Sequence, residues 1–233
     1  MSLEQGLYLD EHFKAEANKS FQVKAKKDKY RVLWKFLQVN RKEANVLDIG
    51  SGKGFDLIAL GDCKFSIGLD VISEYLRQLT GFNRIRATGE LLPFKDNFFH
   101  IVDADNVLEH IKHDEKAVSE IYRVLDKNGI AIINVPAHRL LWSKADIVVG
   151  HYRRYSAKEM KKLFSKFEIV SFNHRNFVLS FIQIVLEILH LYTLRNDEGA
   201  MGAVSPFLLK FLNMEQRFPL PFGTSFVLIC RKA

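Results

Sequence analysis

A glycine-rich stretch directly after an apolar run is the feature that most constrains how this 233-residue chain can fold. Residues 45–49 are typical of a short buried strand, and Gly50, Gly52 and Gly54 follow at once. Glycine allows a positive φ in a tight turn, and without a Cβ it lets backbone N–H groups approach a ligand closely. A helix predicted from residue 55 adds the positive end of its dipole. The stretch therefore predicts a nucleotide-like ligand at the carboxyl end of a central strand.

The spacing of these glycines separates classes of cofactor. A dinucleotide-binding loop reads G-x-G-x-x-G and would place a glycine where this chain has Phe55. A P-loop requires Ser or Thr after Gly-Lys, but Lys53 is followed by Gly54. What remains is Asp-x-Gly-x-Gly-x-Gly, with Asp48 at the end of the strand. An ordinary glycine-rich turn is the alternative interpretation of this stretch taken by itself.

Strands and helices alternate regularly after residue 44. Strands are predicted at 45–49, 64–71, 84–87, 99–103, 130–135, 168–173 and 225–230. Helices are predicted at 54–61, 73–79, 114–125, which Lys127-Asn128-Gly129 would cap, and 156–167, which a capping box of Ser156 and Glu159 would begin. The alternation predicts an α/β fold, Rossmann-like and doubly wound, with a mostly parallel seven-stranded sheet covered on both faces.

Two regions lie outside this alternation. Residues 1–43 are predicted to form an N-terminal helical cap, and residues 44–233 a single domain with a helical insertion at about 174–222 before the last strand. Residues 177–194 of the insertion are almost continuously apolar, but polar residues recur on one helical face: Ser180, Gln183, Glu187 and His190. A membrane span would carry Glu187 near its centre, which is costly, so we expect a helix packed on the domain instead. Dimerisation and peripheral membrane contact remain alternatives for its apolar side.

The composition is that of an ordinary globular protein, with 48% hydrophobic and 26% charged residues. The net charge is +7, and many of the basic residues lie between 24 and 35, where a solvated helix face is the expected structure. An anionic partner is the alternative, but no motif for binding nucleic acid accompanies the charge. Cys63 and Cys230 are far apart and predict reduced core thiols. With no signal peptide at the start of the sequence, a cytoplasmic protein is expected.

Acidic and small residues follow the other predicted strands. Asp70 ends the second strand about twenty residues after the first glycine, where such folds place the acid that binds ribose hydroxyls. A carboxylate can accept two hydrogen bonds from a vicinal diol, and Val71 beside it could pack on an adenine ring. The alternative role for Asp70 is to cap the next helix.

Two further segments carry a family resemblance. Glu90-Leu91-Leu92-Pro93-Phe94 precedes the fourth strand, and Asn106-Val107-Leu108-Glu109-His110 follows it. Together with the glycine loop and Asp70, they resemble the UbiE-like, or type 11, group of class I S-adenosylmethionine (SAM) methyltransferases. The resemblance covers about 44–135. It implies that SAM is the cofactor and S-adenosylhomocysteine (SAH) the product.

The resemblance also implies roles for residues. The cofactor would contact Asp48, Gly50, Ser51, Gly52, Gly54, Asp70, Val71, Thr88, Gly89, Glu90, Leu91, Asn106 and Val107. The glycines would lie at its methionine and ribose end, and the 88–91 segment beside the adenine. His110 would face the acceptor. The family often has Asp where this chain has Thr88, and a hydroxyl would accept the bond from the adenine amino group more weakly.

A second stretch resembles a narrower subgroup. The sequence Leu-Trp-Ser at 141–143, Asp146 and Gly-His-Tyr-Arg-Arg-Tyr at 150–155 resemble a signature of methyltransferases that accompany enzymes of cell-surface glycans. The predicted substrate-binding residues are Trp142, Tyr152, Arg153, Arg154 and Tyr155. Arginines suit a phosphate or carboxylate, and tyrosines suit a sugar or a ring. Alternatively, the two arginines tie the loop to the body of the domain.

The sequence thus predicts a SAM-dependent methyltransferase that acts on a small-molecule, lipid-linked or glycan-linked acceptor. Methyl transfer is an in-line displacement, and a hydroxyl acceptor also needs a base, for which His110 and His151 are the candidates. No metal site is predicted, since His110, His113 and Asp114 fit a helix start better than a ligand set. A nicotinamide-dependent oxidoreductase and a binding protein without turnover are the alternatives.

Overall fold

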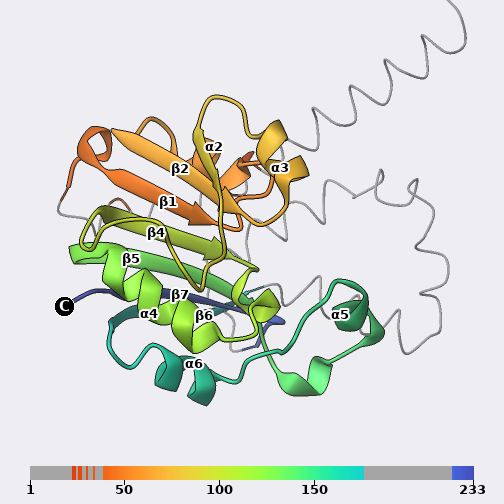
Figure 1. Cartoon of the computed structure of the whole chain (residues 1–233). Helices are drawn as coiled ribbons and strands as arrows, with labels where there is room; N and C mark the ends of the chain where they lie inside the picture. The colour runs from red at the N-terminus through yellow and green to blue at the C-terminus, as the bar shows by residue number, and fades with distance from the viewer. Residues whose placement is uncertain (1–22, 25, 28–29, 31–33, 35–38, 176–221) are drawn as a thin grey trace, which may run out of the picture.

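The computed structural model describes residues 23–24, 26–27, 30, 34, 39–175 and 222–233 (Figure 1). The strands are β1 (Asn45–Ile49), β2 (Phe65–Asp70), β3 (Asn83–Arg86), β4 (Phe99–Asp105), β5 (Leu125–Pro136), β6 (Glu168–Arg175) and β7 (Ser225–Arg231). The α-helices are α2 (Phe55–Leu60), α3 (Ser73–Gln78), α4 (Asp114–Val124), α5 (Lys144–Val148) and α6 (Ala157–Leu163). Short 3₁₀ helices are η1 (Arg41–Glu43), η2 (Leu108–His110) and η3 (Arg139–Leu141).

The strands form one seven-stranded sheet in the order β3-β2-β1-β4-β5-β7-β6. All neighbours are parallel except β7, which runs antiparallel to both β5 and β6. The chain builds outward from β1 to β3 and then returns to β4, so the strand order reverses between β1 and β4. Ligands of open α/β sheets bind beyond the carboxyl ends of the strands at such a switch point. The predicted fold class is confirmed.

Both faces of the sheet are covered, and alternate residues of each strand serve the two faces. Leu47, Val102 and Ile133 belong to a core that α4 and α6 complete. Val46 and Ile101 belong to a second core, which α2 and α3 complete together with the buried Tyr30. Figure 1 shows α4 and α6 lying along one side of the sheet. Because both faces of the central strands are buried, most of their residues are apolar, which explains the apolar runs in the sequence.

The predicted cap of the helix at 114–125 is wrong. The helix α4 ends at Val124, and the segment 127–129 already belongs to β5. A Cβ on Gly129 would lie 2.8 Å from the backbone oxygen of Asp126 and 3.0 Å from that of Phe99. Position 129 therefore requires glycine because neighbouring backbone atoms in the sheet lie too close for a Cβ, and not because the residue caps a helix.

The predicted capping box of α6 is confirmed. The Ser156 hydroxyl accepts a hydrogen bond from the backbone N–H of Glu159, and the Glu159 carboxylate accepts one from the backbone N–H of Ser156. The helix itself is shorter than predicted and ends at Leu163. Most of the predicted cap at 1–43 and the helix at 177–194 lie outside the described residues. Within the part of the chain that is described, no helix is long and apolar enough to span a membrane.

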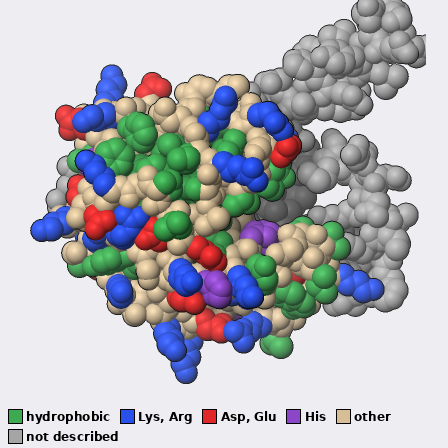
Figure 2. Space-filling view, viewed as in Figure 1, with side chains coloured by type: hydrophobic (Ala, Val, Ile, Leu, Met, Phe, Trp, Pro, Cys, Tyr) green, Lys and Arg blue, Asp and Glu red, His purple; other side chains and the backbone are tan. Residues whose placement is uncertain are grey.

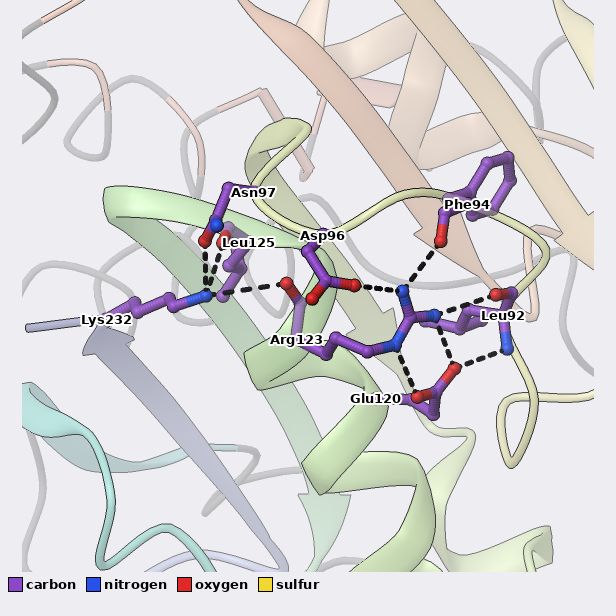
Figure 3. Close-up of polar contacts among 8 residues, drawn as sticks. All are labelled: Leu92, Phe94, Asp96, Asn97, Glu120, Arg123, Leu125 and Lys232. Carbon is purple, nitrogen blue, oxygen red and sulfur yellow. Dashed lines mark hydrogen bonds and ion pairs between the residues drawn. The ribbon is translucent and has the colours of Figure 1, made fainter.

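A polar network fixes the connection between β3 and β4 (Figure 3). The Arg123 guanidinium of α4 bonds both carboxylate oxygens of Glu120 at 2.7 Å and donates to the backbone oxygens of Leu92 and Phe94 at 2.9 and 2.7 Å. Glu120 in turn accepts a bond of 2.8 Å from the backbone N–H of Leu92. Arg123 also pairs with Asp96 at 2.7 Å. The network holds in place the segment that directly follows residues 88–91 of the predicted cofactor site.

Candidate functional site

A cavity of about 790 Å³ lies at the carboxyl ends of β1, β2 and β4. Its lining includes nine of the residues predicted to bind the cofactor: Gly50, Gly52, Asp70, Val71, Thr88, Gly89, Glu90, Asn106 and Val107. His110 and Tyr152 also line it. Four other predicted cofactor residues are not part of the lining: Asp48, Ser51, Gly54 and Leu91. The structure thus brings together, in one cleft at the switch point, segments that lie as far apart as residues 50 and 152.

The three glycines of the loop share a left-handed backbone, with φ values of 68°, 50° and 78° for Gly50, Gly52 and Gly54. A Cβ on Gly50 would lie 2.3 Å from Val107, and one on Gly54 would lie 2.0 Å from Leu79. A Cβ on Gly52 would meet nothing within 4 Å. Gly52 therefore leaves its backbone open to the cleft, as a loop that cradles a nucleotide requires.

The Asp70 carboxylate is buried and already holds two backbone groups. One oxygen accepts a hydrogen bond of 3.0 Å from the N–H of Gly52, and the other accepts one of 2.9 Å from the N–H of Ile72. Asp70 therefore fixes the glycine loop and the start of α3 at once. Each carboxylate oxygen retains a second lone pair, so these bonds are compatible with a ligand diol.

The turn after β4 is tight. Asn106 adopts a positive φ of 54°, a conformation that Asn tolerates better than most residues. Its backbone N–H donates to the carbonyl oxygen of Asn134 at 2.9 Å, and its side chain donates to Asp105 at 3.1 Å. This turn places Val107 against Gly50 at the centre of the cleft.

An acidic cluster beneath the loop includes Asp48. Asp48 and Asp103 are register partners on β1 and β4, both buried, with ligand atoms close to those of Asp56. Lys26 pairs with Asp56 at 2.6 Å and with Asp105 at 2.8 Å. Asp48 thus lies in the α2-side core, not in the lining of the cleft. The cluster was not predicted, because only the sheet register brings its members together.

The buried Tyr30 belongs to the same cluster. Its hydroxyl donates a hydrogen bond to Asp56. Burial raises the pKa of this phenol well above its usual value, and the nearby Asp103 carboxylate raises it further. The phenol therefore stays protonated and can remain a donor to the carboxylates.

Beside the cleft, a hydrogen-bonded chain orients His151. Its Nδ1 lies 2.7 Å from an Asp146 carboxylate oxygen. The same oxygen accepts a bond of 2.9 Å from Arg154, and the other accepts one of 2.8 Å from the backbone N–H of Ser143. Burial raises the pKa of Asp146, but the bonds from Arg154, Ser143 and His151 outweigh it, so the net pKa is lowered. Asp146 is thus a carboxylate that fixes the ring of His151.

Glu109 and His110 face the same histidine. A backbone bond of 2.8 Å from Tyr152 to Glu109 joins the two segments, and the rings of His110 and His151 lie 4.7 Å apart at 73°. Burial raises the pKa of Glu109 to about 8. Burial and then His151 lower the pKa of His110, against a hydrogen bond to the backbone of Gly150. The roles of Glu109 and Asp146 were missed, although both lie within the motifs of the sequence.

The predicted substrate residues separate into two groups. Arg153 pairs with Asp114 at 2.7 Å and donates to the backbone oxygen of Lys112, and Tyr155 donates to Asp114 at 2.9 Å. Arg153 thus ties the loop to α4, whereas Arg154 binds Asp146 within the loop itself. Tyr152 is exposed at the cleft, and Trp142 is exposed outside its lining. Arg153 and Tyr155 instead line a smaller cavity of about 400 Å³ between α4 and α6.

Exposed apolar side chains gather over α5, next to the cleft, on the face seen in Figure 2. Val148 is 85% exposed, and Ile147 and Val149 are exposed as well. Val149 also lines the cleft. This surface belongs to the loop after β5, where the sequence predicts the acceptor.

Comparison with known proteins agrees with this geometry. Residues 47–133 match the model of a methyltransferase domain, the type 11 family. The match over residues 47–133 and the Rossmann-like fold support a class I methyltransferase domain, a family whose members use SAM as the cofactor. The cleft fits such a group, because the open backbone at Gly52 and the Asp70 carboxylate offer contacts for a nucleoside.

Individual relatives are similar over this region. The chain is 34% identical over 99 residues to the uncharacterized methyltransferase YcgJ of Bacillus subtilis, covering 38% of this chain and 39% of YcgJ. It is 30% identical over 121 residues to the ubiquinone/menaquinone biosynthesis C-methyltransferase UbiE of Pectobacterium atrosepticum, covering 43% of this chain and 47% of UbiE. The chain thus spans less than half the length of these relatives.

Solved structures show the same fold over more of the chain. A SAM-dependent methyltransferase of Thermotoga maritima superposes with a TM-score of 0.61 at 18% identity, covering 97% of this chain and 96% of that one. The crystal structure of YcgJ superposes with a TM-score of 0.54 at 22% identity, covering 86% and 94%.

Proposed function

We propose that this protein transfers a methyl group from SAM to an acceptor bound between the cleft and the 138–155 loop. The observation that supports it most directly is one cleft lined by Gly50 and Gly52 of the glycine loop, Asp70, the 88–90 segment, and Asn106, Val107 and His110. In this proposal Asp70 binds the ribose hydroxyls, and Thr88 to Leu91 flank the adenine. Bound SAM supplies an electrophilic methyl group on a sulfonium.

The protein's own contribution to such a reaction is alignment and, for a hydroxyl acceptor, removal of a proton. The turn at Asn106 and Val107 would position the reactive end of the cofactor. His110 lines the cleft and His151 is held by Asp146, so both stay candidates for the proton-accepting group. Tyr152 is the predicted substrate residue that reaches the cleft.

The acceptor is proposed to be a small molecule or a lipid- or glycan-linked compound. The glycan alternative is supported by the sequence from Trp142 to Tyr155, and a lipid-linked acceptor by the exposed apolar residues over α5. We propose a cytoplasmic protein with no nucleic-acid partner. Peripheral membrane contact or a dimer interface is proposed for the 177–194 segment, which lies outside the described residues.

The test is calorimetric titration of SAM, SAH and NADH into wild type, Asp70→Asn and the surface control Asp62→Asn. SAM and SAH should bind wild type and the control alike. Because Asp70→Asn removes a charged acceptor for two hydroxyls and loosens the loop, affinity should fall about ten- to a hundredfold. Binding of NADH alone would overturn the proposal in favour of an oxidoreductase.

A turnover measurement then separates an enzyme from a binding protein. SAH formation is followed with SAM and separate pools of lipid-linked glycans, free sugars and small aromatic acids. SAH above the level without acceptor supports catalysis and identifies the class of acceptor. Tight SAM binding with no SAH from any pool would favour a binding protein.

A further inference from the structure

We propose that Glu109, His110 and His151 bind a divalent transition-metal ion of the Zn²⁺ class at the acceptor side of the cleft. One carboxylate oxygen and one nitrogen from each imidazole lie within 4.8 Å of one another. Two imidazoles and one carboxylate are a ligand set that Zn²⁺ and related ions accept, with bonds of roughly 2.0–2.2 Å. The site brings together η2 and the 150–155 segment, which the backbone bond from Tyr152 to Glu109 joins.

The first argument is the orientation of His151. Metal-bound histidines almost always donate the N–H of their other ring nitrogen to a carboxylate or a carbonyl oxygen. The Nδ1 of His151 lies 2.7 Å from Asp146, which Arg154 and Ser143 hold in place, so Nε2 is the nitrogen left for a ligand. His110 has a hydrogen bond to the backbone of Gly150 and can likewise offer its second nitrogen.

The second argument is the state of Glu109. Its side chain is 1% exposed, and its Oε2 is buried without a hydrogen-bond partner. Its Oε1 lies 3.9 Å from the Nε2 of His151, too far for a hydrogen bond. An ion between these two atoms would need them to approach by less than about 1 Å. It would also supply the partner that a buried carboxylate otherwise lacks.

The third argument is charge. A Glu109 carboxylate that binds an ion is ionised, and it and Asp146 then face one permanent cation, Arg154, so the cluster has one negative charge more than it has positive. A divalent ion would offset this charge. No other Lys or Arg pairs with either carboxylate among the described residues.

The fourth argument is access. His110 is exposed and lines the cleft, so an ion can reach the cluster from that side. Three protein ligands leave one position open, which is typical of zinc sites that bind a substrate rather than of structural ones. We assign that position to an oxygen of the methyl acceptor. This assignment rests on the proposed function, whereas the metal site itself does not.

The test uses the full chain without a polyhistidine tag, stripped of metal with a chelator. Equilibrium dialysis against Zn²⁺ with elemental analysis gives stoichiometry and affinity, and the visible spectrum of the Co²⁺ complex reports the ligand geometry. The variants are Glu109→Gln, His110→Ala, Asp146→Asn and the matched control His113→Ala, an exposed histidine outside the cluster. SAM binding is measured on the same samples, and circular dichroism confirms folding.

We expect one Zn²⁺ per wild-type chain and an unchanged value for His113→Ala. Loss of the Asp146 carboxylate should weaken binding about ten- to a hundredfold, and loss of a direct ligand at least as much. If wild type does not bind Zn²⁺, the proposed metal site is wrong even if SAM binds. The site is equally wrong if His110→Ala, a substitution of an exposed residue that should not disturb folding, binds Zn²⁺ as tightly as wild type. Zn²⁺ binding without SAM binding would support the site and refute its use for a methyl acceptor.

Discussion

Gly50, Gly52 and Gly54 share a left-handed backbone but differ in what a side chain would meet. The sequence could predict that the loop needs glycine, because the pattern follows a strand. It could not predict that Gly50 packs on Val107 and Gly54 on Leu79, because those contacts depend on how distant segments pack. For the same reason the sequence does not show which loop residues line the cleft: Gly50 and Gly52 do, whereas Ser51 and Gly54 do not.

The glycines provide the first prediction. Gly50→Ala should destabilise the protein by more than the control Gly81→Ala, which has a φ of 80° but no atom within 4 Å of its Cβ. A left-handed residue with a Cβ costs about 1–2 kcal/mol, and only Gly50→Ala adds a clash with Val107. Urea denaturation measures both free energies of unfolding. Equal losses would show that Val107 moves freely and that backbone strain alone requires the glycine.

Near the predicted acceptor site, the sequence identifies some functional candidates but not the residues that surround them. His110 and His151 were identified as candidates, since histidine chemistry is recognisable by residue type. Glu109 directly precedes His110, but the sequence does not predict its burial, because the burial depends on how the segment after β4 packs. Asp146 lies within the 141–155 stretch that resembles the glycan-associated subgroup. Its bond to His151 cannot be predicted from the sequence, because it depends on how the chain turns after α5.

At the scale of elements, helix starts were predicted better than helix ends. Ser156 and Glu159 cap each other within one turn, so local sequence defines the beginning of α6. The end of α4 is different, because Leu125 leaves the helix to pair with Phe99 on β4. That pairing is long-range, and it turned a segment typical of a helix cap into part of a strand.

The network that Figure 3 shows on α4 leads to a prediction about pH. The bond from Arg123 lowers the pKa of Glu120 from its usual value of 4.5. The unfolded chain therefore binds more protons between the two pKa values, and stability is lost as the pH falls below about 4.5. Glu120→Gln should lower the free energy of unfolding at pH 7 by about 1–2 kcal/mol, with a smaller difference at pH 3.

Urea denaturation at pH 7, 5 and 3 measures this difference. Glu115→Gln is the control, because Glu115 is exposed on the same helix and makes no contact with Arg123. If the free energy of unfolding of Glu120→Gln is below that of wild type by as much at pH 3 as at pH 7, the charge of the carboxylate does not account for its stabilising effect.

At the scale of the whole molecule, the sequence predicts the sheet, because short apolar runs typical of strands alternate along the chain with segments of helical periodicity. It did not predict that β7 would enter between β5 and β6, since nothing local distinguishes an inner strand from an edge strand. This insertion fully buries Cys230 between Ala131 and Ile169. Burial raises the pKa of its thiol.

Cys230 therefore provides a test of the insertion. In the Cys63→Ser variant, a disulfide reagent should label Cys230 only when the sheet opens, at least roughly a thousandfold more slowly than it labels an unfolded chain. In wild type the partly exposed Cys63 should react first. Rapid labelling of Cys230 with an intact circular dichroism spectrum would show that β7 detaches by itself.

The place of β7 has a consequence for the timing of synthesis. Among the described strands, β6 pairs only with β7, which begins about 50 residues later in the chain. At ribosomal rates of roughly 5–20 residues per second, β6 would wait for several seconds before its partner emerged. During that interval β5 would also present an open edge. The nascent chain therefore passes through a stage in which two strand edges are open to association, and this is where a chaperone would be most needed.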